Sequence, residues 1–164
     1  KAPGHLFGLD ALLDRYPDAR IIQTHRDPLR VIASIASLTT VLRRAFSDSA
    51  DPKRIAADWC DRWSSALDRC LESRDHRPAE RFFDIAYADL VASPLATMER
   101  LYDFLGWRLS SEARESMENF LSENPRNKYG AHRYALADFG LDRAVATQRF
   151  ARYCERFEIP VDSQ

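Results

Sequence analysis

The sequence predicts an α/β fold whose C-terminal half is rich in helices. Short apolar runs typical of strands alternate with amphipathic helical patterns early in the chain, and helical patterns dominate later. Proline follows Asp or Ser at the expected starts of three helices, where its fixed φ suits the first turn. These pairs are Asp27-Pro28, Asp51-Pro52 and Ser93-Pro94.

Four elements are expected in the first half of the chain. Leucines at helical spacing predict a helix from Leu6 to Tyr16, and residues 20–25 form the first strand candidate. A long amphipathic helix follows Asp27-Pro28, and its predicted apolar face consists of Val31, Ile32, Ile35, Leu38, Leu42 and Phe46. The helix after Asp51-Pro52 presents a face interpreted as core, made of Ile55, Trp59, Trp63, Ala66 and Cys70.

The second half adds one strand candidate, residues 81–86, and then helices. Ser93-Pro94 opens a helix that Gly106 stops, and another is expected near residues 111–121. Residues 124–140 look irregular and basic, and a final helix is expected from about Leu141 to Phe157. Because two strands cannot make a stable sheet with both faces covered, we expect the sheet to need strands beyond this sequence.

Composition limits the classes of function. The length of 164 residues suits a single domain over residues 1–164, and the formal net charge of −1 gives no basic field for nucleic acid. Three cysteines without CxxC spacing argue against a zinc site or a disulfide framework and favour free thiols in a reducing, cytoplasmic compartment. No apolar run approaches the roughly 20 residues of a transmembrane segment. The oligomeric state stays open.

The most informative segment is the break between the first strand and the helix that follows it. Arg26 stands at the end of the strand, Asp27-Pro28 starts the helix, and Ser34 lies two turns into it. A helix N-terminus favours anions, and the planar guanidinium of Arg donates a fork of hydrogen bonds that suits phosphate oxygens. The segment therefore predicts part of a phosphate site. The alternatives are an ion pair of Arg26 with a nearby carboxylate and a Ser34 hydroxyl bonded to a helix carbonyl.

Four ordered segments resemble the PAPS-dependent sulfotransferases, most closely the bacterial branch of that family. The family has an Arg at a strand end and a Ser eight residues later, as Arg26 and Ser34 are here. The other segments are Lys1-Ala2-Pro3-Gly4-His5-Leu6 upstream, Ile85-Ala86-Tyr87-Ala88-Asp89-Leu90 downstream, and the basic stretch 124–141. The Gly- and Thr-rich loop that binds the 5′-phosphosulfate in the family has no counterpart in this sequence, so we expect the chain to be N-terminally incomplete.

The resemblance implies a P-loop NTPase-like three-layer sandwich with a mostly parallel sheet. It also implies sulfuryl transfer from PAPS, without a metal, to a hydroxyl or amine of a small-molecule, lipid or carbohydrate acceptor. Arg26 and Ser34 would bind the 3′-phosphate, and Tyr87 would lie near the adenine. Arg126 and Lys128 would belong to a loop that closes over the nucleotide, His5 would be the general base, and Lys1 would stabilise the sulfate or the departing 5′-phosphate.

Each of these roles has a plainer alternative. His5 could be a surface histidine or could cap the helix near Gly8, Lys1 could be an ordinary solvated lysine, and Tyr87 could simply pack. The charges at Arg126 and Lys128 could be no more than a solvated loop. For the whole chain, a P-loop-type nucleotide kinase and a non-catalytic helical binding module with a vestigial nucleotide site remain the alternative functions.

Overall fold

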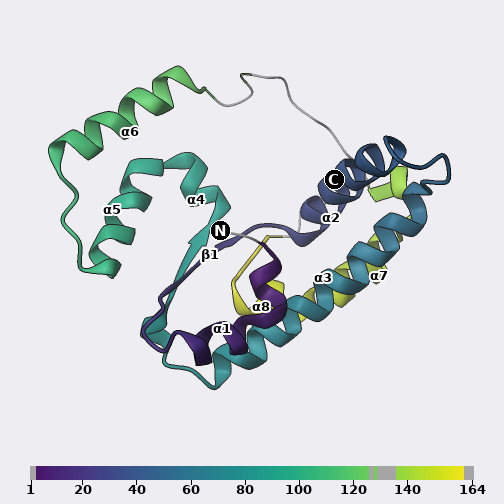
Figure 1. The fold of residues 1–164 in the computed structure, drawn as a ribbon, viewed down its shortest axis with the longest axis horizontal. Coiled ribbons are helices and arrows are strands. Elements are labelled where there is room, and N and C mark those ends of the chain that lie inside the picture. Colours follow the sequence, from purple (N-terminus) through teal and green to yellow (C-terminus); the bar gives the residue numbers. More distant parts are fainter. Residues whose placement is uncertain (1–2, 126–127, 129–135, 161–164) are drawn as a thin grey trace. The chain divides into compact units, whose positions relative to one another are not determined.

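The structure, a computed structural model, describes residues 3–125, 128 and 136–160 (Figure 1). The chain divides into two compact units. The first comprises residues 1–19, 26–79 and 134–164, and the second comprises residues 20–25 and 80–133. Each unit is described by itself below. Among the described residues, no helix is both long enough and apolar enough to cross a bilayer.

The first unit is helical. Its elements are η1 (Pro3–Gly8), α1 (Leu9–Arg15), α2 (Pro28–Arg44), α3 (Pro52–Asp75), η3 (Leu136–Phe139), α7 (Arg143–Arg149) and α8 (Ala151–Arg156). The expected leucine-rich helix is thus a 3₁₀ turn followed by α1. Helices α2 and α3 begin as predicted, because the carboxylates of Asp27 and Asp51 accept hydrogen bonds from the backbone N–H of Leu29 and Lys53, both at 2.9 Å.

The face that α2 buries differs from the predicted one. Its buried side chains are Leu29, Ile32, Ala33, Ala36 and Thr40, together with Pro28. Of the residues expected on this face, Ile32 is buried, whereas Leu38, Leu42 and Phe46 are exposed. The small side chains of Ala33 and Ala36 pack in one cluster with Ile55 and Ala56 of α3, so the helices meet on the side with small residues.

Helix α3 buries the face predicted for it. Ile55, Ala66 and Cys70 are buried, and the half-buried Trp59 and Trp63 pack against the core. The Trp59 indole N–H donates to Thr39 Oγ1 at 2.9 Å, which satisfies its polar atom. The main cluster joins α3 to α2, α7 and α8, and its buried members are Leu29, Ile32, Cys60, Leu67, Leu71, Ala146, Phe150 and Tyr153.

The expected C-terminal helix is interrupted. Phe150, only 1% exposed, adopts φ −102° and ψ 5° between α7 and α8. Its N–H bonds Thr147 O at 3.2 Å, an i→i−3 bond that tightens the turn. The break lets the Phe150 ring enter the core, and periodicity alone does not reveal it.

The second unit contains the sheet. Strand β1 (Ile21–His25) runs parallel to β2 (Phe82–Ala86), with Ile21 opposite Phe82 and His25 opposite Ala86. The chain enters β2 through η2 (Ala79–Arg81) and continues into α4 (Tyr87–Ala92), α5 (Pro94–Leu105) and α6 (Ser111–Glu123). Gly106 ends α5 at φ 70°, as predicted, because glycine adopts this left-handed conformation without steric cost. The parallel pairing and the helix-rich remainder confirm the predicted α/β class.

Candidate functional site

The junction of β1 and α2 presents polar side chains to solvent. Arg26 directly follows β1 and is exposed, as are Arg30 and Ser34 on α2. Arg30 and Ser34 are four residues apart and therefore share one face of the helix. Asp27, 7% exposed, already accepts the Leu29 N–H at the start of α2. A phosphate here would therefore depend on the side chains, a guanidinium and a hydroxyl, and these donors fit its oxygens.

A pair that the sequence did not reveal fixes the end of the sheet. His25 is 4% exposed, and its Nε2 lies 2.8 Å from Asp84 Oδ1 on β2. The register places Gln23 opposite Asp84, so His25 is the diagonal neighbour two residues further on. The pair ties the carboxyl end of β1, the point from which Arg26 leaves the strand, to β2. A histidine at the end of an apolar strand was the available signal in the sequence.

His5 lies on η1 and is exposed. No hydrogen bond of its ring occurs among the described residues, and α1 begins at Gly8 without a side-chain cap. The capping alternative for His5 is therefore not observed. An exposed imidazole remains accessible to a substrate hydroxyl, which is what a general base requires.

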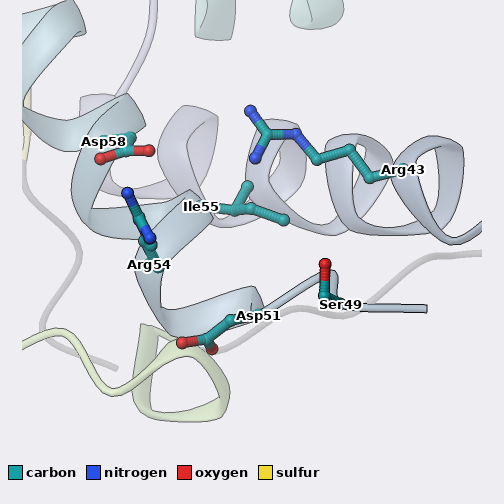
Figure 2. A pocket seen from close by; sticks show the side chains of 6 residues that line it. All are labelled: Arg43, Ser49, Asp51, Arg54, Ile55 and Asp58. Carbon is teal, nitrogen blue, oxygen red and sulfur yellow. The ribbon is translucent and has the colours of Figure 1, made fainter. Parts of the chain in front are cut away.

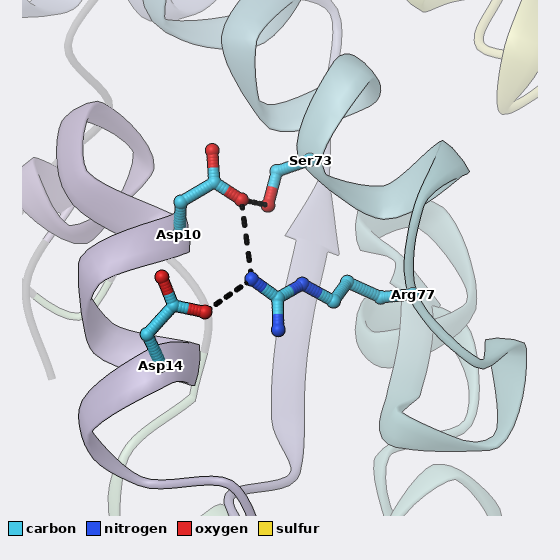
Figure 3. Close-up of polar contacts among 4 residues, drawn as sticks. All are labelled: Asp10, Asp14, Ser73 and Arg77. Atoms are coloured by element: carbon cyan, nitrogen blue, oxygen red, sulfur yellow. Dashed lines mark hydrogen bonds and ion pairs between the residues drawn. The ribbon is translucent and has the colours of Figure 1, made fainter.

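The segment that carries His5 is anchored to the end of α3 by a polar cluster on α1 (Figure 3). Arg77 Nη2 lies 2.5 Å from Asp14 Oδ1 and 3.7 Å from Asp10 Oδ1, and the Ser73 hydroxyl donates to Asp10 Oδ1 at 2.5 Å. The hydrogen bond with Asp14 raises the pKa of the Arg77 guanidinium above its ordinary value. The cluster holds α1, and through it η1, against α3.

The remaining predicted residues are placed in part. Tyr87 is half-buried at the first position of α4, directly after β2. Lys128 is exposed, and its Nζ donates to Glu123 O at 2.8 Å and to Asn124 Oδ1 at 3.1 Å. Lys128 therefore interacts with the C-terminal end of α6, where a cation is favoured. Lys1 and Arg126 lie outside the described residues.

A shallow polar pocket lies at the other end of α2 (Figure 2). Its volume is about 470 Å³, and its lining residues are Arg43, Ser49, Asp51, Arg54, Ile55 and Asp58. None of the predicted site residues that the structure describes lines it, and Arg43 and Arg54 form no ion pair within the described part of the chain. The pocket thus shares none of its lining residues with the β1–α2 junction.

Cys60, Cys70 and Cys154 form no disulfide bond among the described residues. Cys60 and Cys70 are buried, and Cys154 is half-buried. Burial, with the nearby Asp27 carboxylate, raises the pKa of Cys154 from 9.0 to about 11, and burial also raises that of Cys60. Both groups stay protonated near neutral pH and are poor nucleophiles. The described residues contain no group of His, Cys, Asp and Glu suited to hold a metal ion.

Comparison with known proteins places this geometry in a family. Residues 1–111 match the sulfotransferase family. Over 163 residues the chain is 25% identical to the omega-hydroxy-beta-dihydromenaquinone-9 sulfotransferase Stf3 of Mycobacterium bovis, covering 96% of this chain and 40% of the relative. The Stf3 of Mycobacterium tuberculosis matches to the same extent. The chain therefore spans about 40% of the length of these curated relatives.

Two solved structures agree with the fold. The sulfotransferase STF9 from Mycobacterium avium matches with a TM-score of 0.91 and 28% identity, covering 100% of this chain and 42% of that one. The sulfotransferase STF1 from Mycobacterium tuberculosis matches with a TM-score of 0.78 and 38% identity. The match covers 93% of this chain and 38% of the STF1 chain. Since the family match covers more than half of the sequence and these structures support its P-loop-like α/β fold, the chain belongs to the sulfotransferase family.

Proposed function

We propose that this chain is part of an enzyme that transfers a sulfuryl group from PAPS to a hydroxyl or amine, and that residues 1–164 act as one domain in it. The observation that carries the proposal is the exposure of Arg26 and Ser34 at the β1–α2 junction, inside the segment that matches the family. Ligands of open α/β sheets bind at the carboxyl ends of the strands, and Arg26 leaves β1 at that end.

Arg26 and Ser34 would bind the 3′-phosphate of the nucleotide. The guanidinium can donate two parallel hydrogen bonds to phosphate oxygens, and the Ser34 hydroxyl can add a third. Asp27 keeps the first turn of α2 in place by capping it, so the two donors are held on a fixed backbone. Arg30 shares the face of Ser34 and adds positive charge there.

His5 would act as the general base. When bound, PAPS supplies a sulfuryl group whose S–O bond to the 5′-phosphate breaks as the acceptor oxygen attacks sulfur. The imidazole of His5 would take the proton that the acceptor hydroxyl loses. The cluster around Arg77 would keep η1 in place during this step.

The other predicted residues would complete the nucleotide site. Tyr87 would offer its ring to the adenine, and Arg126 and Lys128 would bind phosphate from a closing loop. Lys1 would stabilise charge on the departing phosphate. Fixed cations would supply this stabilisation, so no metal is part of the proposal. We place the protein in the cytoplasm, a proposal supported by its three cysteines, which form no disulfide bond among the described residues.

A lipid alcohol is the acceptor class that we propose to test first. The support is the name of the curated relatives, which are omega-hydroxy-beta-dihydromenaquinone-9 sulfotransferases. Small-molecule and carbohydrate alcohols are the comparison substrates, because the described residues do not define an acceptor pocket next to His5.

A calorimetric titration with adenosine 3′,5′-bisphosphate tests the nucleotide site. We expect metal-independent binding that Arg26→Ala weakens by about 2 kcal/mol or more, because a charged hydrogen-bond donor is lost. Arg43→Ala is the matched control, an arginine at the far end of the same helix, and should bind as the wild type does. Tight binding of ATP that requires magnesium would instead favour a kinase, and no nucleotide binding by the wild type would refute the proposal.

A further inference from the structure

The outer face of α2 carries exposed apolar side chains along its second half. Leu38 is 58% exposed, Val41 64% and Leu42 56%, and Phe46, just after the helix, is 91% exposed. Spacings of three and four residues place Leu38, Val41 and Leu42 on one side of the helix. We call these four residues the α2 ridge.

The α2 ridge does not belong to the core of its unit. The core side of α2 holds Leu29, Ile32, Ala33, Ala36 and Thr40, which pack toward α3 and the C-terminal helices. A helix at a protein surface ordinarily turns polar residues outward. Helix α2 follows that rule at Arg30 and Ser34 and departs from it one turn later. An exposed stripe of large apolar residues marks an interaction surface.

The charge around the ridge is locally basic. Helix α2 contains Arg30, Arg43 and Arg44 and no acidic residue. Residues 28–54 hold five basic and two acidic side chains, whereas the whole chain has a net charge of −1. Arg43 and Arg44 lie in the last turn of α2, between the ridge residues Leu42 and Phe46, and both are exposed. The basic charge is therefore concentrated where the apolar side chains are exposed.

We propose that the α2 ridge docks the protein on a bilayer that contains anionic lipids. Leu38, Val41, Leu42 and Phe46 enter the boundary between headgroups and acyl chains, and Arg43 and Arg44 contact lipid phosphates. Interfacial helices combine these two features, apolar side chains of the Leu and Phe type beside basic ones. Figure 1 shows α2 and α3 joined by a turn at their shared end. Phe46 lies in this connection, because α2 ends at Arg44 and α3 begins at Pro52. The proposal does not depend on sulfuryl transfer, because docking needs no nucleotide.

Co-sedimentation with sucrose-loaded vesicles tests this docking. We expect the protein to bind vesicles of phosphatidylcholine mixed with phosphatidylglycerol, and to bind phosphatidylcholine alone far more weakly. The double variant Leu42→Ser/Phe46→Ser should lose roughly tenfold or more in vesicle affinity, since two large apolar contacts are removed. The variant Arg43→Gln/Arg44→Gln should lose affinity for the anionic vesicles and remove most of the salt dependence.

Matched controls use exposed apolar residues elsewhere. Val145→Ser on α7 and Phe120→Ser on α6 alter side chains that are 55% and 64% exposed, and both variants should bind vesicles as the wild type does. No binding of the wild type to anionic vesicles would overturn the proposal. The ridge would then be expected to pack against another part of a longer polypeptide. The proposal would also be overturned if the ridge variants kept vesicle binding but were monomers in sedimentation velocity where the wild type is a dimer. The ridge would then bind a second copy of this chain. Nucleotide titration in parallel keeps these outcomes distinct from failure of the proposed function.

Discussion

The two faces of α2 differ in what they contribute. The inner face is buried, rich in small side chains, and packed on α3 through Ala33 and Ala36. The outer face keeps Arg30 and Ser34 in solvent and then turns apolar. One helix thus uses one side for stability, and we propose that it uses the other for recognition. Substitutions on the inner face should change the free energy of unfolding, whereas substitutions on the outer face should change binding.

The largest expected effect is on the inner face. Ile32, 1% exposed, lies in the main core cluster, so Ile32→Ala should lower the free energy of unfolding by about 2–5 kcal/mol. Leu38→Ala on the outer face is the matched control, and its change should stay within about 0.5 kcal/mol. Urea unfolding followed by circular dichroism measures both. Equal losses in the two variants would contradict the division between the faces.

The next effect concerns the rate of sulfuryl transfer and the exposed side chain of His5, which lies outside the core. In an active preparation, His5→Ala should reduce the rate of sulfuryl transfer by about 100-fold or more, because the proposed general base is removed. Nucleotide affinity and the free energy of unfolding should stay close to those of the wild type. Single-turnover transfer of labelled sulfate measures the rate. A variant that turns over normally would show that another group takes the proton.

A smaller effect is expected at Ser34 on the outer face of α2. Ser34→Ala should weaken the binding of adenosine 3′,5′-bisphosphate by about 1 kcal/mol, the usual contribution of one hydrogen bond. Its unfolding midpoint should not fall, because the side chain is exposed and alanine favours helix. Titration calorimetry of the variant provides the measurement. Unchanged nucleotide affinity would remove Ser34 from the site.

A further effect is a dependence of the free energy of unfolding on pH, which arises at Cys154 near the start of α2. The pKa of Cys154 is raised to about 11 by burial and by Asp27, whereas its ordinary value is 9.0. The folded protein therefore keeps the thiol proton to higher pH than the unfolded chain, and stability should fall as the pH rises from about 9 to about 11. Cys154→Ala should reduce this slope in urea unfolding. An unchanged slope would show that other groups control alkaline unfolding.

Local signals in the sequence predicted the starts of helices and the strands, because caps, proline and apolar runs act within a few residues. The predicted positions of Arg26 and Ser34 at a strand–helix junction are likewise confirmed as positions, while their roles stay predictions. The buried face of α2 was predicted wrongly because the helix is apolar on two sides, and α3 decides between them. The His25–Asp84 pair and the break at Phe150 depend on contacts between distant segments, which periodicity does not encode.

The most direct test of the account compares two nucleotides across one substitution. Adenosine 3′,5′-bisphosphate and adenosine 5′-monophosphate differ only in the 3′-phosphate, so the ratio of their affinities measures its contribution. We predict that the wild type prefers the bisphosphate by roughly 30-fold or more and that Arg26→Ala lowers the ratio to about fivefold or less, the preference that the Ser34 hydrogen bond alone would leave. A ratio that persists in Arg26→Ala would show that the 3′-phosphate lies elsewhere and would contradict the account.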